Sequence, residues 1–154
     1  MATEIWSNSW PLMRVAKANL MPFHPGGVQA KGWDETLHVV VGVSGSGTLT
    51  IGGTPYEIKV GDVLVIPWSE AVAYVAHKKD GLTIASIHLV PRTENVVEGE
   101  NYHHRDLGQV RARLPPAGLP KIPMKKSSAS CLPNVLDVAL GIVDTWSLET
   151  VHST

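Results

Sequence analysis

The fold is decided by residues 38–67, which read HVVVGVSGSGTLTIGGTPYEIKVGDVLVIP. The apolar segments of this stretch are short and rich in Val, Ile and Thr, the residues that β-strands favour. Glycine-containing turns separate these segments at Gly45-Ser46-Gly47, Gly52-Gly53 and Gly61-Asp62. The pattern therefore predicts a meander of short antiparallel strands.

The same pattern continues on both sides of this stretch. We expect strands near His38–Val43, Gly47–Ile51, Thr54–Lys59, Val63–Ile66, Ala71–Ala76 and Thr83–Val90, preceded by a short strand near Met13–Leu20. Short strands joined by tight hairpins argue for a barrel or sandwich rather than an open parallel sheet. The turn spacing resembles that of the cupin barrel, a double-stranded β-helix of jelly-roll type. The expected fold class is all-β with a C-terminal helix.

Length and composition favour a single domain. A chain of 154 residues with 44% hydrophobic content can bury one sizeable core. Four zones are expected within it: an N-terminal arm and first strand in residues 1–33, the cupin barrel core in 34–91, a proline-rich crossing loop in 92–133 and an amphipathic helix in 134–149. The crossing loop has room for one further strand, near Gln109–Leu114.

The helix is predicted from a capping residue and an apolar stripe. Asn134 is a favourable N-cap. The positions that follow repeat apolar residues at helical spacing, and the stripe includes Val135, Val138, Ile142 and Trp146. Such a stripe needs a partner surface, either the barrel of the same chain or a second subunit. The second alternative predicts a homodimer that pairs through these four residues.

Charge and cysteine content exclude several classes of function. The formal net charge is -1, so no global field attracts the chain to nucleic acid. Cys131 is the only cysteine, which excludes an intrachain disulfide and fits a reducing compartment. The sequence contains no apolar run of the length of a signal peptide or a membrane span. We expect a cytoplasmic protein with no membrane partner.

The metal ligands of a typical cupin are largely missing. Such a barrel supplies two histidines and a glutamate near the first glycine turn and a third histidine later. Counted from the glycine turns, those positions hold Gly32, Asp34, His38 and Val72. Stable metal sites generally need three protein donors. The sequence therefore predicts a barrel with no metal and no other cofactor.

Several motifs together resemble the N-terminal effector-binding and dimerisation domain of AraC-type transcription regulators. They are Leu37 to Val41, Ser44 to Leu49, Gly52 to Tyr56, Val60 to Pro67, and Tyr74. The resemblance implies that the barrel holds a small-molecule effector and that the helix pairs subunits. Regulators of this type bind DNA through a separate helix-turn-helix region, so DNA contact is expected only through a domain absent from this chain. The chain is either an excised regulatory domain, which we favour, or a free-standing cupin.

Candidate ligand contacts lie on the last long strand. Ile84, Ser86 and His88 share one face by alternation, and the residues between them take the other. Alternation leaves open which face is inward, because both faces are partly apolar. His38 begins one strand and His88 nearly ends another, so the two imidazoles could converge as ligand donors or as a catalytic pair. A core imidazole bonded to a backbone carbonyl is the other alternative for each.

The resemblance adds aromatic candidates. It implies that Tyr74 contacts a sugar, and that Ser86 stands where the family often places a stacking tryptophan. Trp33 or Trp68 could replace that platform, because an indole offers an apolar face to a sugar ring. Each is alternatively a packing residue at the barrel mouth.

Two functions follow from these observations. The first is a sensor that binds a small sugar or polyol through Tyr74, His88, Ser86 and His38 and transmits the bound state to a paired subunit. The second is a small cupin enzyme, an isomerase or a metal-dependent dioxygenase. The incomplete ligand set favours the sensor.

Overall fold

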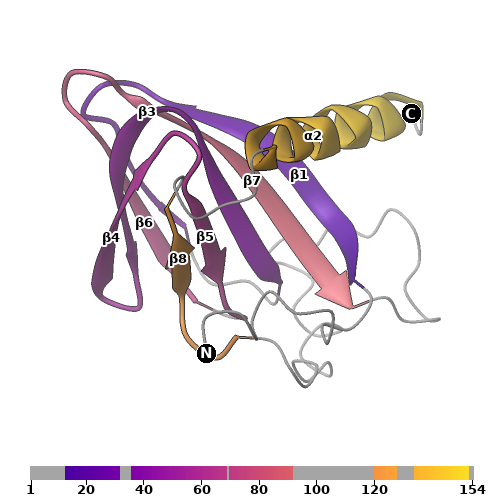
Figure 1. Cartoon of the computed structure of the whole chain (residues 1–154), viewed down its shortest axis with the longest axis horizontal. Helices are drawn as coiled ribbons and strands as arrows, with labels where there is room; N and C mark the ends of the chain where they lie inside the picture. The colour runs from indigo at the N-terminus through magenta and orange to yellow at the C-terminus, as the bar shows by residue number, and fades with distance from the viewer. Residues whose placement is uncertain (1–12, 32–35, 69, 92–119, 128–133, 153–154) are drawn as a thin grey trace.

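The computed structural model describes residues 13–31, 36–68, 70–91, 120–127 and 134–152. It is a β-structure with one long helix (Figure 1). The elements are β1 (Met13–Phe23), β2 (Val28–Lys31), β3 (Leu37–Ile51), β4 (Thr54–Lys59), β5 (Val63–Ile66), β6 (Val72–Ala76), β7 (Leu82–Pro91), β8 (Met124–Lys126) and α2 (Val135–His152). The predicted fold class, all-β with a C-terminal helix, is confirmed.

The strands form two antiparallel layers that share β3. One layer has the order β1-β7-β3-β5-β8. In the other layer β2 pairs with β6, and both β6 and β4 pair with β3. The first half of β3 pairs with β5 and β7, and its second half pairs with β4 and β6. This long bent strand joins the two layers (Figure 1).

The course of β3 shows that one predicted turn was wrong. Gly45-Ser46-Gly47 was expected to form a turn between two strands, but β3 runs through it without a break. Three glycines let the backbone pack closely there: a Cβ would overlap the carbonyl oxygen of Lys59 at Gly42 and that of Gly81 at Gly45, and at Gly47 it would lie 2.5 Å from that of Val75. The glycines therefore permit close backbone approach in a strand and do not end it.

The alternation along β3 and β7 divides the core into two clusters. The inner cluster lies between the layers and includes Val40, Leu49, Tyr74 and Ile84. The outer cluster lies on the other face of the first layer and includes Leu37, Val41, Val63, Val65, Ala85 and Ile87. The face of β7 that carries Ile84, Ser86 and His88 is therefore the inward one.

The helix α2 covers the outer cluster. It begins at Val135, and the N–H of Val138 donates to the carbonyl of Asn134 at 3.0 Å. Ala139 and Val143 are buried against the barrel, and Val135, Ile142 and Trp146 pack there in part. Burial of a side chain such as Val143 stabilises the fold by roughly 1.5–3 kcal/mol. The barrel of the same chain thus receives most of the apolar stripe.

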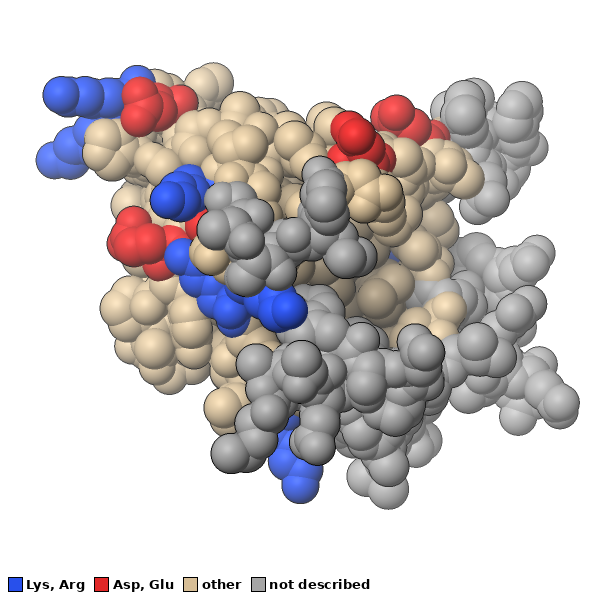
Figure 2. Space-filling view, in the orientation of Figure 1, with Lys and Arg blue, Asp and Glu red and all other residues tan. Residues whose placement is uncertain are grey.

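One residue of the predicted stripe lies apart from the others. Val138 is 52% exposed and belongs to the solvent face of α2. Figure 2 shows acidic side chains over this part of the molecule, where Asp137 and Asp144 are exposed. The pairing of a second subunit with the stripe remains a prediction.

No helix within the described ranges has the length and apolar character needed to span a membrane.

The structure contains two strands that were not predicted. β2 pairs with β6, and β8 pairs with β5 within the predicted crossing loop. The ammonium of Lys125 on β8 lies 3.4 Å from the fully buried carboxylate of Asp62. β1 extends beyond the predicted strand and includes Pro22, which an edge strand tolerates because one side of its backbone is free. The strand predicted near Gln109–Leu114 and the arm in residues 1–12 lie outside the described residues.

Candidate functional site

Five polar side chains meet at one end of the barrel interior. We call Lys31, Thr36, His38, Ser86 and His88 the histidine cluster. The strand register explains how they meet: His38 is paired with His88, and Val40 is paired with Ser86, across β3 and β7. Directly paired residues of antiparallel strands project from the same face. Lys31 comes from the end of β2 in the opposite layer.

Short hydrogen-bond distances connect the cluster. Nε2 of His38 lies 2.7 Å from Oγ of Ser86, and Nδ1 of His88 lies 2.7 Å from Oγ1 of Thr36. Nζ of Lys31 lies 2.9 Å from Nε2 of His88. A longer distance of 3.4 Å joins Oγ of Ser86 to Nε2 of His88. These contacts compensate the desolvation of the polar groups, which costs roughly 1–3 kcal/mol for each group left unpaired.

The lysine determines the proton positions on His88. An ammonium can only donate, so Nε2 of His88 accepts from Lys31. The proton of a neutral imidazole is then on Nδ1, from which it is donated to Thr36. In its neutral form, His88 thus has a defined tautomer in this arrangement.

The environment of His38 also favours the neutral form. Burial lowers the pKa of His38 well below its ordinary value, and the nearby His88 and Lys31 lower the pKa further. The ring of His38 is stacked on that of His88, with 4.1 Å between centroids and an interplanar angle of 11°. The site thus favours a neutral His38 beside His88 and the ammonium of Lys31.

Tyr74 points into the same interior. It is fully buried in the inner cluster and lies on β6, where it is paired with Gln29 of β2 and with Leu49 of β3. Its ring stacks on Phe23, with centroids 5.2 Å apart. The predicted ligand-binding residues Tyr74, His38, Ser86 and His88 therefore all face inward. Their role as ligand contacts remains a prediction.

The two predicted tryptophan platforms are placed differently. Trp68 packs in part against the outer cluster, on the helix side of the first layer. Its indole N–H is buried, and no hydrogen-bond partner for it occurs among the described residues. Trp33 lies outside the described residues. A ligand contact by either tryptophan remains a prediction.

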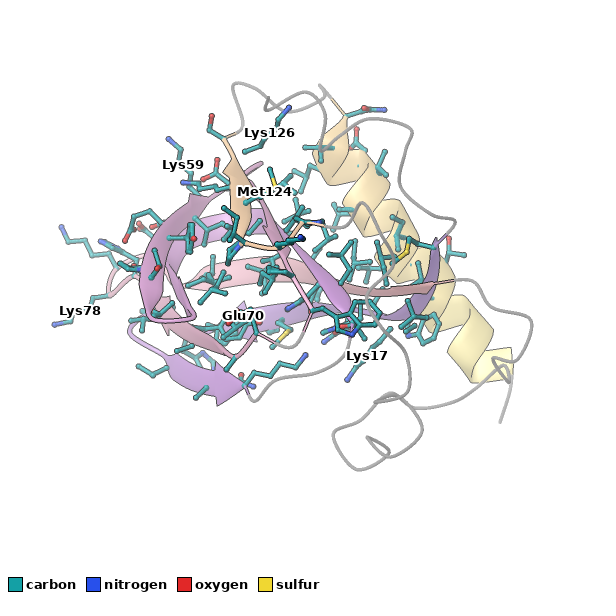
Figure 3. The ribbon with its side chains drawn as sticks, turned by 90° about the horizontal axis from the view of Figure 1, so that it is seen from below. Lys17, Lys59, Glu70, Lys78, Met124 and Lys126 are labelled. Atoms are coloured by element: carbon teal, nitrogen blue, oxygen red, sulfur yellow. The ribbon has the colours of Figure 1, made fainter. Side chains whose placement is uncertain are left out.

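Sequence reasoning missed two members of the histidine cluster, Lys31 and Thr36. Lys31 was missed because β2 was not predicted, and Thr36 because it immediately precedes a strand. Register adds two further candidates on β1: Asn19 is paired with Ser86, and Lys17 is paired with His88. Figure 3 shows Lys17 at the end of the barrel opposite to that of Lys78. The sequence did contain a signal for these two residues, because Lys17, Asn19 and Met21 alternate along the strand and therefore share one face.

The position of the fourth expected metal ligand is apolar in the structure. Val72 is buried in the inner cluster. Gly32 and Asp34 lie outside the described residues. Within the ranges that are described, no group of three His, Cys, Asp or Glu side chains could hold a metal ion. A metal-free barrel accordingly remains a prediction.

Comparison with known proteins places the sequence in a family. The model of the AraC-like ligand-binding domain matches residues 25–108. A search of curated protein sequences gave no significant match.

Solved structures similar to the chain include cupins. The cupin domain of Cnp3 from Schizosaccharomyces pombe is 15% identical, with a TM-score of 0.44, and the match covers 46% of this chain and 53% of that one. A cupin protein from Bacteroides fragilis is 22% identical, with a TM-score of 0.41 and coverage of 57% and 71%. The cupin domain of an XRE family transcriptional regulator from Enterobacter cloacae is 15% identical, with a TM-score of 0.44 and coverage of 53% and 97%. The chain thus spans about half the length of the yeast domain.

Proposed function

Because the chain belongs to the family of AraC-like ligand-binding domains, we propose that it is the sensing domain of a transcription regulator and holds a small sugar or polyol in its barrel. The observation that carries this proposal is the histidine cluster. Its members come from both layers and face the barrel interior. A buried group of donors and acceptors inside an otherwise apolar core is the usual composition of a small-molecule site.

The chemistry of the cluster suits a polyhydroxy molecule. A neutral imidazole presents one donor and one acceptor, and a serine or threonine hydroxyl presents both. Sugar hydroxyls likewise donate and accept, so each can replace a contact that the cluster now makes within itself. Tyr74 and Phe23 add stacked aromatic surface to the interior.

The regulatory part of the proposal concerns a second subunit. In this account the effector stabilises one arrangement of two paired chains over another, and a separate DNA-binding domain responds to that difference. The exposed Val138 on α2 is the member of the predicted dimerisation stripe that remains available for such pairing.

A thermal-shift screen of sugars and polyols tests the sensing function. A ligand that binds the folded state raises the melting temperature as its concentration exceeds the dissociation constant. We expect at least one polyhydroxy compound to bind the wild type saturably, and Ser86→Ala to weaken that binding. Thr145→Ala is the control, because Thr145 is exposed on α2 and its hydroxyl donates to the carbonyl of Gly141 in the same helix. Equal affinity of wild type and Ser86→Ala would contradict binding at the cluster.

A further inference from the structure

We propose that Asn19 determines the specificity of the site by binding two adjacent hydroxyls of a sugar. The inference rests on the proposed function and deepens it, because it names the residue that distinguishes one polyhydroxy ligand from another. It starts from the register of β1, which places Asn19 directly opposite Ser86 on β7.

The side chain of Asn19 faces the barrel interior. Ser86 is on the inward face of β7, and directly paired residues of antiparallel strands project from the same face. The neighbouring Ala18 is buried in the outer cluster, as alternation requires for the opposite face. Met21, two residues beyond Asn19, packs against the inner cluster. The carboxamide of Asn19 is therefore on the same side of the layer as the hydroxyl of Ser86.

Asn19 also lies on the side of the histidine cluster that a ligand can approach. In the first layer β7 is flanked by β3 on one side and by β1 on the other, and β1 stands at the end of the strand order (Figure 1). Ser86 is fully buried, and His38 and His88 are each 4% exposed. Asn19 is half-buried, so part of its side chain stays accessible. A ligand that reaches Ser86 from the β1 edge therefore meets Asn19.

The carboxamide of Asn19 has hydrogen-bonding capacity that the cluster does not use. The Ser86 hydroxyl lies 2.7 Å from Nε2 of His38 and 3.4 Å from Nε2 of His88, so its contacts are made within the cluster. In the part of the chain that the structure describes, no hydrogen bond joins the Asn19 side chain to another residue. A ligand can therefore bond to Asn19 without breaking a contact of the protein.

The chemistry of a carboxamide matches a pair of neighbouring hydroxyls. Its oxygen accepts hydrogen bonds, and its nitrogen donates two protons from the same planar group. One sugar hydroxyl can donate to the oxygen while the next hydroxyl accepts from the nitrogen. A single hydroxyl satisfies only one of the two, and a polar atom left without a partner weakens binding. Asn19 is thus expected to favour a sugar with two adjacent hydroxyls over its deoxy analogues.

Matched sugars that differ by one hydroxyl test the inference with the whole chain. The probes are D-glucose and D-galactose, each compared by calorimetry with its 2-deoxy, 3-deoxy and 4-deoxy derivatives. We expect the wild type to bind one hexose saturably. Two of the deoxy derivatives of that hexose, at adjacent ring positions, should bind about fivefold or more weakly than the hexose itself.

Variants of Asn19 assign this preference to the carboxamide. Asn19→Leu keeps a branched side chain of similar size without polar atoms, and Asn19→Ala removes the group. In both variants the hexose should bind about fivefold or more weakly, and its preference over the two deoxy sugars should fall to within about twofold, because the same interaction is already lost. Leu20→Ala is the control on the same strand, because Leu20 is 44% exposed and faces the opposite side. Circular dichroism of each variant checks that the fold persists.

The outcomes separate the two proposals. If Ser86→Ala weakens hexose binding while both Asn19 variants bind the hexose as tightly as the wild type, this inference is overturned and the proposed function stands. An equal preference over the deoxy sugars in the wild type and in the Asn19 variants would also overturn the inference. Absence of binding by both hexoses would contradict the inference, whereas the wider screen of sugars and polyols decides the proposed function.

Discussion

The imidazoles of His38 and His88 stack in the barrel interior with 4.1 Å between their centroids, although they come from positions 50 residues apart in the sequence. The pairing of β3 with β7 places them directly opposite each other. Both rings are buried, and each has a hydroxyl partner within 2.7 Å, Ser86 for His38 and Thr36 for His88. The two rings are therefore part of the buried core and also part of the candidate site, so their protonation is expected to affect both.

Acidification should destabilise the protein through His38. The pKa of His38 is lowered in the folded state, whereas in the unfolded chain it returns to about 6.5. The unfolded state therefore binds more protons below that pH, and the free energy of unfolding falls by up to about 1.4 kcal/mol per pH unit. Stability is fully present above the unfolded pKa and decreases as the pH drops toward the folded one.

Urea denaturation between about pH 7.5 and 5.5 measures this dependence. His38→Gln should flatten the slope. His77→Gln is the matched control, because His77 is exposed in the β6–β7 hairpin, away from the core. If the free energy of unfolding depends on pH as steeply in His38→Gln as in the wild type, a group other than His38 causes the dependence.

Two glycine substitutions should have opposite effects on stability. Gly42→Ala places a Cβ against the carbonyl oxygen of Lys59, and such overpacking typically costs about 1–3 kcal/mol. Gly141→Ala lies in α2 with open space around the added Cβ, and its expected effect is a gain of roughly 0.5–1 kcal/mol. Thermal or urea denaturation measures both. Tolerance of Gly42→Ala would show that β3 and the end of β4 can move apart at this point.

The dimer prediction can be tested at two neighbouring helix positions. Val138 is exposed, so Val138→Asp should give a folded monomer if α2 pairs subunits. Ala139 is buried against the barrel, so Ala139→Asp should destabilise the fold itself. Sedimentation velocity and circular dichroism separate the two effects. A wild-type chain that remains monomeric at high micromolar concentration would contradict pairing.

A charge at Ile142 would be a less discriminating test than Val138→Asp. Ile142 packs in part on the outer cluster of its own barrel, so a charge there is expected to perturb the fold as well as any interface. Trp146 also packs in part on the outer cluster, so a charge at that position is expected to perturb the fold as well.

Removal of the Tyr74 hydroxyl should weaken ligand binding. If the hydroxyl contacts the effector, Tyr74→Phe lowers the affinity by about 1 kcal/mol or more. The ring and its stacking on Phe23 are retained, so the fold should persist. Calorimetry with whichever probe binds measures the change. An unchanged affinity would remove Tyr74 from the contact set.

Local patterns were sufficient to predict much of the fold. Alternation and turn residues predicted β4, β5 and β7 closely, and Asn134 with the apolar stripe predicted α2. They failed where a glycine serves packing between layers, as at Gly45 and Gly47 in β3. They also failed for β2 and β8, whose three or four residues pair with distant strands and have little pattern of their own.

The site could be predicted only in part for the same reason. His38, Ser86 and His88 lie on strands with clear alternation, and the burial of Ile84 with Val40 settles which face is inward. Lys31 enters the cluster through the pairing of β2 with β6, a tertiary contact that spacing along the chain does not encode.

The most direct test of the account is a histidine-selective NMR titration with D-glucose and D-glucitol. Imidazole nitrogen shifts report both contact and protonation at each ring. We predict that a binding probe moves the signals of His38 and His88 saturably while those of the exposed His77 stay in place. Saturable binding, established independently by calorimetry, that leaves the signals of His38 and His88 unchanged would contradict a ligand site at the histidine cluster.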